Sequence, residues 1–196
     1  MSRLSRDFFA RDTLAVAREL LGQRLVRVLD GERLSGRIVE VEAYIGEGDQ
    51  ACHASRGRTR RNATMFGPPG HAYVYFIYGM HYCLNVVTER EEYPAAVLIR
   101  ALEPREGIEV MRARRGGVPD VRLTSGPARL CQALGIDRRF DGADLCVSDA
   151  LLFIEKDTVV PDEAVATGPR IGVRGDERAL TIPWRFYVRG SRYVSR

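Results

Sequence analysis

The stretch GRIVEVEAYIG, residues 36–46, is predicted to be a β-strand that carries two carboxylates. Side chains in a strand alternate between two faces. One face would hold Val39, Val41, Ala43 and Ile45, which suits a core. The other would hold Ile38, Glu40, Glu42 and Tyr44. The residues alone leave two interpretations of this second row open: the wet face of an antiparallel sheet, or the floor of a working cleft.

The elements on both sides of this strand predict a single α+β domain, residues 1–196, around a mixed or antiparallel sheet. Residues 11–22 form a helix capped by Asp12 or Thr13 and ended by Gly22. Residues 23–29 and 33–44 form a hairpin. Further strands are predicted at 71–87, interrupted near Gly79, and at 95–102, 145–156 and 185–195. Helices are predicted at 103–116, behind Pro104, and at 124–135, capped by Ser125, while residues 46–70 form a loop without regular structure.

Arginine dominates the basic charge and is clustered. The net charge is +4, from 30 basic and 26 acidic residues, and Lys156 is the sole lysine. The abundance of arginine is also what a biased genome composition would give, so the clustering is the informative feature. Three clusters contain no acid: residues 53–61, 112–115 and 184–196. Clustered guanidinium groups favour a polyanionic partner.

The cysteine spacing and the absence of several sequence motifs argue against several classes of protein. Four cysteines, at positions 52, 83, 131 and 146, include no Cys-x-x-Cys pair, which favours a reducing cytosol. No apolar leader or membrane span is present, so we expect a cytoplasmic protein, in a bacterial cytosol or nucleoid. The spacing of Cys52-His53 and of His81-x-Cys83 matches no common zinc pattern. Phosphate-loop, dinucleotide and serine-hydrolase motifs are absent, and no metal or cofactor is expected.

Two further features break the local pattern. Residues 73–82 contain four tyrosines beside the arginine-rich loop. They suit cross-strand aromatic pairs in a sheet, or equally a platform that stacks and inserts between bases. Arg100 ends an apolar run, where it either reaches solvent by snorkelling or pairs with Glu40 or Glu42 in a cleft.

Five blocks in order resemble the 3-methyladenine (alkyladenine or alkylpurine) DNA glycosylase family over nearly the whole chain. They are GRIVEVEAYIG, YVYFIYGMHYCLNV, VLIRALEP, SGPARLCQALGI and FYVRGS. The resemblance implies an α+β domain with a central curved, mostly antiparallel sheet, surrounding helices and a protruding hairpin that wedges into DNA. It also favours the interpretation of the opening strand as a cleft floor, with Glu40 in a structural role.

The resemblance implies a role for each matching residue. Glu42 matches the general base and Arg100 the arginine that holds the attacking water. The walls of the base pocket match Tyr44, His53 and Tyr75, with Asn85 on its floor. Tyr78 matches the DNA wedge and Met80 lies beside it, whereas His81 receives no role. The loop after His53 departs from the family pattern, and contacts to the DNA backbone are expected from charge at Arg56, Arg58, Arg60, Arg61 and Arg129.

The implied activity is that of a monofunctional glycosylase, a monomer that flips alkylated and deaminated purines out of double-stranded DNA and starts base-excision repair. No lysine lies near the motifs, so water is the expected nucleophile. The residues name no general acid and do not rank 3-methyladenine, 7-methylguanine, hypoxanthine and ethenoadenine. A non-catalytic module that recognises damaged DNA or RNA, and a hydrolase of free nucleosides, are the alternatives.

Overall fold

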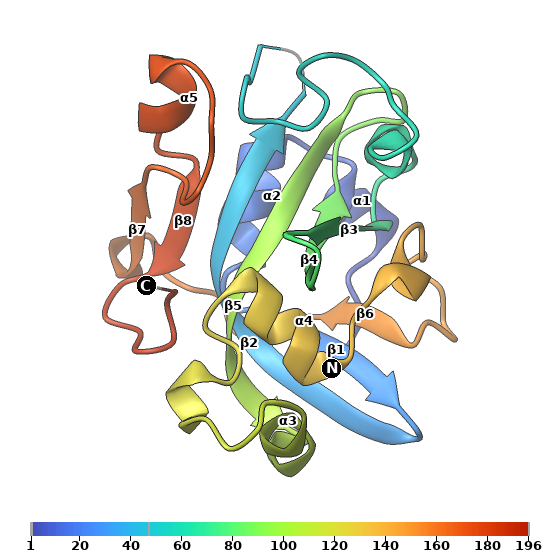
Figure 1. The fold of residues 1–196 in the computed structure, drawn as a ribbon, viewed down its shortest axis with the longest axis vertical. Coiled ribbons are helices and arrows are strands. Elements are labelled where there is room, and N and C mark those ends of the chain that lie inside the picture. Colours follow the sequence, from blue (N-terminus) through green and yellow to red (C-terminus); the bar gives the residue numbers. More distant parts are fainter. Residues whose placement is uncertain (1, 47, 196) are drawn as a thin grey trace.

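A computed structural model (Figure 1) describes residues 2–46 and 48–195 and contains one eight-stranded sheet. Residue 47, in the predicted loop, and Arg196, in the third arginine cluster, lie outside the described residues. The strands are β1 (Arg24–Leu29), β2 (Glu32–Ile45), β3 (Ala72–Ile77), β4 (His81–Val87), β5 (Ala95–Glu106), β6 (Leu152–Glu155), β7 (Val165–Gly168) and β8 (Arg185–Val188). Their order is β3-β4-β5-β2-β1-β6, and β8 pairs with both β2 and β7. The pairings between these strands are antiparallel, which confirms the predicted α+β fold.

The helices are short and lie around the sheet. They are α1 (Arg6–Phe9), α2 (Thr13–Leu20), α3 (Ile108–Arg114), α4 (Pro127–Leu134) and α5 (Glu177–Thr181). In Figure 1, α2 lies behind the sheet and α4 in front of it, so each face of the sheet is covered by a helix. Val16 and Leu20 of α2 and Leu130 of α4 belong to the main buried core. No helix in the described part of the chain is long and apolar enough to cross a membrane.

The pairing of the central strands β2 and β5 has three register shifts, one between Ser35 and Gly36 and two β-bulges on either side of Glu40. The Cα partners are Ile38 with Leu102, Glu40 with Ala101 and Val41 with Ile99. Val39 is therefore an extra residue on β2, and Arg100 is an extra residue on β5. Bulges re-aim side chains and are frequent next to active sites. These two lie beside Glu40.

The bulge at Val39 overturns the expectation of simple alternation along residues 38–45. Ile38 joins Val41 and Ala43 in the main core, whereas Val39 lines a surface groove beside Tyr193. An extra residue moves the side chains that precede it to the opposite face. Glu40 and Glu42 are fully buried, so the interpretation of their row as a wet face is wrong.

The predicted first helix and first hairpin are confirmed. In α2, Asp12 accepts a hydrogen bond from the backbone N–H of Ala15 at 2.9 Å. The β1–β2 hairpin turns at Asp30 and Gly31, both of which have positive φ. That geometry is the one a two-residue turn needs to match the twist of its strands.

Two helix starts differ from prediction. The helix predicted behind Pro104 begins instead at Ile108, because residues 103–106 continue β5 and Pro104 pairs with Gly36. Ser125 does not cap α4, whose N-cap is Gly126. The hydroxyl of Ser125 instead accepts from Arg129 at 3.2 Å. Tertiary contacts override the local signal at both positions.

Two C-terminal segments that were predicted to be strands contain less strand than expected. The segment 145–156 contributes only β6, and 185–195 contributes only β8 within the sheet. Conversely, the loop 46–70 contains one 3-10 turn, Ala63–Phe66. Met65 and Phe66 of this turn pack with Tyr73 and Cys52 in a second, smaller core that supports the site described next.

Candidate active site

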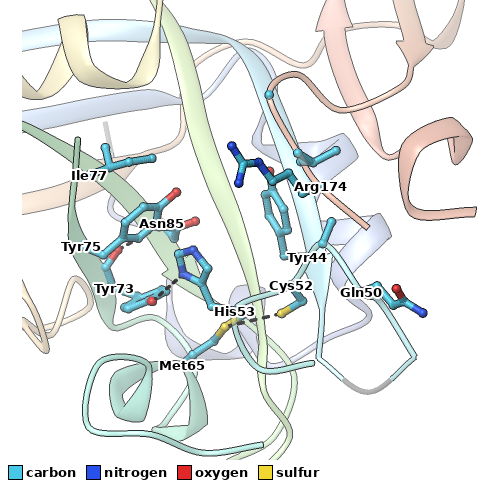
Figure 2. Close-up of a pocket in the computed structure, with 13 residues that line it drawn as sticks. Tyr44, Gln50, Cys52, His53, Met65, Tyr73, Tyr75, Ile77, Asn85 and Arg174 are labelled. Carbon is cyan, nitrogen blue, oxygen red and sulfur yellow. Dashed lines mark hydrogen bonds between the residues drawn. The ribbon is translucent and has the colours of Figure 1, made fainter. Parts of the chain in front are cut away.

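A cavity of about 280 Å³ lies beside this second core (Figure 2). Its wall contains the four residues predicted for the base pocket: Tyr44, His53, Tyr75 and Asn85. The other lining residues are Gln50, Ala51, Cys52, Met65, Tyr73, Ile77, Gly172, Val173 and Arg174. Figure 2 shows Tyr44 and Arg174 on one side of the cavity, and Tyr73, Tyr75, His53 and Asn85 on the other.

Strand alternation builds the aromatic wall. Tyr73, Tyr75 and Ile77 are alternate residues of β3 and share one face. The ring centroids of Tyr73 and Tyr75 are 5.5 Å apart. Asn85 faces Tyr73 across the β3–β4 pairing and donates its side-chain N–H to the carbonyl of Tyr73 at 3.1 Å. The wall therefore combines ring surfaces with one fixed amide.

His53 completes this wall from the loop after β2. Its Nδ1 lies 2.9 Å from the hydroxyl of Tyr73, and its ring packs edge-on against Tyr75 with centroids 4.5 Å apart. Burial lowers the pKa of His53, and the nearby Arg61 lowers it further. The ring is neutral at pH 7, so Nδ1 can accept the hydrogen bond from Tyr73.

Tyr44 forms the opposite wall and connects the cavity to the buried carboxylate behind it. Its hydroxyl donates to Oε2 of Glu42 at 2.8 Å. The guanidinium of Arg170 lies 4.7 Å from the centroid of its ring, and Asp49 binds Arg170 through two contacts of 2.6 and 2.7 Å. Burial, and then Glu42, raise the pKa of Tyr44 well above its usual value, so the phenol stays protonated.

Glu42 is fully buried and does not itself line the cavity. Oε1 of its carboxylate lies 3.1 Å from Nη1 of Arg100 and accepts from the backbone N–H of Ile171 at 2.7 Å. With the bond from Tyr44, both oxygens have partners. The carboxylate is thus held in one orientation, and the side chain of Tyr44 lies between it and the cavity.

Glu40 binds the other side of the same arginine. Its Oε1 accepts from Nε of Arg100 at 3.2 Å and from Arg185 at 3.0 Å, and its Oε2 accepts from the backbone N–H of Ser195 at 2.6 Å. Burial lowers the pKa of Arg100, but Glu42 and Glu40 more than offset this effect and raise its pKa above the usual value. Arg100 thus pairs with both glutamates named as its candidate partners, and it does not reach solvent by snorkelling.

The β3–β4 hairpin carries the two predicted wedge residues at its tip. Tyr78 and Met80 are 78% and 69% exposed, which is unusual for large apolar side chains. Tyr78 has a φ of 53° and Gly79 a φ of 68°, so the turn is tight and presents the phenol outward. Phe76, which no sequence signal marked, adds a third exposed apolar side chain on this hairpin.

The five predicted DNA-backbone arginines lie in two groups. Arg56, Arg58, Arg60 and Arg61 are exposed on the loop beside the cavity. Arg58 pairs with Glu92 at 2.9 Å, and Arg61 lies 6.0 Å from the ring of Tyr75. Arg129 belongs instead to α4 and lines a different concavity.

A search for metal ligands found no group of three or more His, Cys, Asp or Glu side chains within residues 2–46 and 48–195 that could hold a metal ion.

Several residues of this site carry no local sequence signal. Asp49, Arg170, Ile171 and Ser195 hold Tyr44, Glu42 and Glu40 in place, yet no motif in a single chain marks them. Arg174 lines the cavity from the same loop as Ile171. Arg170 stands between Pro169 and Ile171, and these apolar neighbours are a weak indication that it is buried. Since arginine is rarely buried without a partner, its burial would have predicted an acidic residue beside it.

Comparisons with known proteins agree with this geometry. The family model described as methylpurine-DNA glycosylase matches residues 7–192. A protein of Methanocella arvoryzae is 53% identical over 100% of this chain and 97% of its own length. Relatives from Carboxydothermus hydrogenoformans and Myxococcus xanthus are each 50% identical, over 98% and 100% of this chain and 98% and 95% of their own lengths. All three are named as candidate 3-methyladenine DNA glycosylases. Because the family model covers residues 7–192 and the relatives are about half identical over nearly the whole chain, the chain belongs to the methylpurine-DNA glycosylase family.

Proposed function

We propose that this DNA glycosylase is monofunctional: it flips alkylated and deaminated purines out of duplex DNA and hydrolyses their N-glycosidic bonds with a water molecule. The observation that carries the proposal is the link from Tyr44, in the wall of the cavity, to the carboxylate of Glu42, which Arg100 holds at 3.1 Å. Residues 1–196 act in this proposal as one domain, a view supported by the single sheet that β1 and β8 share.

The cavity receives the extruded base. Its volume of about 280 Å³ is near the lower end of the range for small-ligand sites, about 300–1,000 Å³. Tyr44 on one side and Tyr75 and His53 on the other offer ring faces, and stacking contributes about 1–3 kcal/mol per base. A purine alkylated at N3 or N7 is cationic and gains a further cation–π attraction of about 0.5–2 kcal/mol. Asn85 contributes the polar contact that discriminates between purines.

The hairpin tip holds the duplex open. Flipping costs a few kcal/mol in lost stacking and pairing, least for damaged bases. Tyr78 enters the stack in place of the extruded base, and Met80 lies against the neighbouring base pair. Their exposure on a tight turn supports this role, because apolar side chains otherwise avoid such positions.

Glu42 is the general base. The bond breaks through a sugar with oxocarbenium character, which a fixed carboxylate stabilises while it takes a proton from water attacking C1′. The direct contact between Arg100 and Glu42 leaves no space for water between those two atoms, so the water lies beside the pair and Arg100 orients the carboxylate. Lys156, the single lysine, is exposed and outside the cavity lining, which supports water rather than a lysine amine as the nucleophile.

Glu42→Gln tests this assignment. The amide keeps the size of the side chain but cannot take a proton, so we expect single-turnover excision of 7-methylguanine to fall about 10²–10⁴-fold. Binding to a duplex with an uncleavable abasic analogue is expected to stay within a factor of a few. Circular dichroism and thermal unfolding establish that the variant is folded. Excision at the wild-type rate by a folded variant would remove Glu42 from the mechanism.

A further inference from the structure

A second concavity, of about 420 Å³, is lined by three arginines and no acid. Its lining residues are Val121, Arg122, Ser125, Arg129, Arg192 and Val194. The arginines come from three segments: the turn before α4, α4 itself and the tail after β8. Arg129 is among the arginines predicted to contact the DNA backbone, and Arg192 belongs to the arginine cluster at 184–196, whereas Arg122 lies outside both groups. The convergence of the three on one concavity depends on the fold.

The guanidinium groups in this concavity lack carboxylate partners among the described residues. Nη1 of Arg129 donates to the carbonyl and hydroxyl oxygens of Ser125, at 3.0 and 3.2 Å, and Arg192 donates to the hydroxyl of Tyr193 at 3.1 Å. The side chain of Arg122 makes no hydrogen bond or ion pair within residues 2–46 and 48–195. The nearby Asp120 is bound by Arg112 through contacts of 2.8 and 2.6 Å.

A fourth cation adds to the positive field. Arg115 reaches the carbonyl of Arg122, and burial lowers its pKa while Arg129 lowers it further. Like charges held together repel one another, and a bound anion relieves the repulsion of all of them at once. The planar fork of arginine matches the oxygens of a phosphate, to which it donates two parallel hydrogen bonds.

The concavity is built on the same backbone as the buried ion pair of the active site. Ser125 forms a β-bridge with Ala101, the neighbour of Arg100. Val194 precedes Ser195, whose hydroxyl accepts from Nη2 of Arg100 at 3.0 Å. An anion bound here is therefore fixed in position relative to Arg100.

We propose that this three-arginine pocket, formed by Arg122, Arg129 and Arg192, binds one backbone phosphate of the DNA and thereby sets the register of the duplex relative to Glu42 and Arg100. The inference rests on the proposed action on duplex DNA and adds a phosphate site to it. Free inorganic phosphate has the same chemistry and is the other source of ligand for the pocket. The experiment distinguishes the two.

The double variant Arg122→Gln/Arg192→Gln tests the pocket and leaves Arg129 in place. Its affinity for a duplex with an uncleavable abasic analogue is measured by fluorescence anisotropy between 50 and 200 mM salt. We expect binding about tenfold weaker at low salt, the loss of one charge-assisted phosphate contact. The slope of log K against log salt should fall by about 0.9 for that one phosphate. Arg11→Gln/Arg18→Gln removes two arginine charges on the α2 side of the sheet and is the matched control, with little change expected.

A scan of single methylphosphonate linkages then locates the contact. One neutral linkage should weaken wild-type binding about tenfold and leave the double variant unaffected, since the pair forms a double-mutant cycle. Equal losses for both proteins at every linkage would overturn the proposal. So would titration with inorganic phosphate that saturates the pocket while the double variant binds DNA normally. Excision by the wild-type protein is scored separately, so failure of the phosphate site and failure of the glycosylase assignment give different results.

Discussion

At the scale of single residues, two hydrogen bonds fix the polar groups of the cavity walls. The phenol of Tyr44 links the cavity to Glu42, and the phenol of Tyr73 meets the imidazole of His53. The sequence marks Tyr44 and His53 as stacking surfaces through the family resemblance. It does not indicate that Tyr44 also orients the carboxylate, because this role depends on the side-chain geometry at the end of β2.

Tyr44→Phe separates these two roles. The ring and its stacking remain, but Oε2 of Glu42 loses its donor, so the carboxylate is less firmly oriented. We expect single-turnover excision to fall about 10–100-fold, equivalent to roughly 1.4–2.7 kcal/mol, with base binding almost unchanged. Tyr75→Phe is the control, since its hydroxyl makes no hydrogen bond to Glu42. Equal losses in both variants would mean that Tyr44 acts only as a stacking surface.

We expect His53 to make the preference between lesions dependent on pH. Its pKa lies below the usual 6.5, so the ring is neutral above that value and gains a proton only in acid. The charged ring repels a cationic base, and we expect the excision rate of 7-methylguanine relative to hypoxanthine to fall as the pH is lowered below the usual histidine pKa of 6.5. The unfolded chain takes up the proton first as the pH falls, so this group also lowers stability in acid. Parallel pH profiles for His53→Gln, which cannot titrate, should be flatter.

At the scale of elements, the sequence pattern predicts which helices and strands exist better than it predicts their first and last residues. The first helix and the β1–β2 and β3–β4 hairpins follow from caps, glycines and apolar spacing. The bulges at Val39 and Arg100 and the extension of β5 past Pro104 depend on pairing with distant strands. The sequence could therefore name Glu40 and Glu42 as candidate partners of Arg100, but not the bulges that let Arg100 contact both of them at once.

The tip of the β3–β4 hairpin provides a test at this scale. Gly79 has a φ of 68°, and an added Cβ there would meet no atom within 4 Å, so Gly79→Ala introduces backbone strain alone. Gly31, at the tip of the β1–β2 hairpin, has a φ of 82° and equally free space. Each substitution should cost about 1 kcal/mol in thermal unfolding. Only Gly79→Ala should reduce base flipping, measured by 2-aminopurine fluorescence, because only its turn carries Tyr78.

At the scale of the whole molecule, the site is assembled from segments far apart in the chain. Arg170 illustrates this: its guanidinium, fully buried, binds Asp49 and the carbonyls of Ala43 and Ala179. It thereby joins β2, the loop after β2 and α5. Neither residue of this ion pair stands in a recognisable motif, which is why sequence reasoning missed both.

Arg170→Met should be strongly destabilising. It leaves the carboxylate of Asp49 buried without its counter-charge, and breaking such a pair costs about 3–5 kcal/mol. We expect this loss in denaturant unfolding, together with weaker excision because the support of Tyr44 is lost. Arg178→Met is a suitable comparison, since this exposed arginine makes one side-chain hydrogen bond within residues 2–46 and 48–195, to the carbonyl of Gly48. A loss below about 1 kcal/mol for Arg170→Met would mean that water replaces the ion pair.

The hydrogen bond between Arg100 and Ser195 spans 95 positions of the chain and has a consequence for biosynthesis. A ribosome that has translated as far as β5 has made both glutamates and their arginine, but not the backbone N–H groups of Ile171 and Ser195 that fix the two carboxylates. If these residues act as proposed, we expect the nascent polypeptide to lack excision activity until the segment after β5, as far as Ser195, has emerged and folded back. We expect a protease that cuts between β8 and Ser195 to reduce excision, because it releases the backbone N–H that fixes Glu40 while every residue that lines the base pocket stays in place.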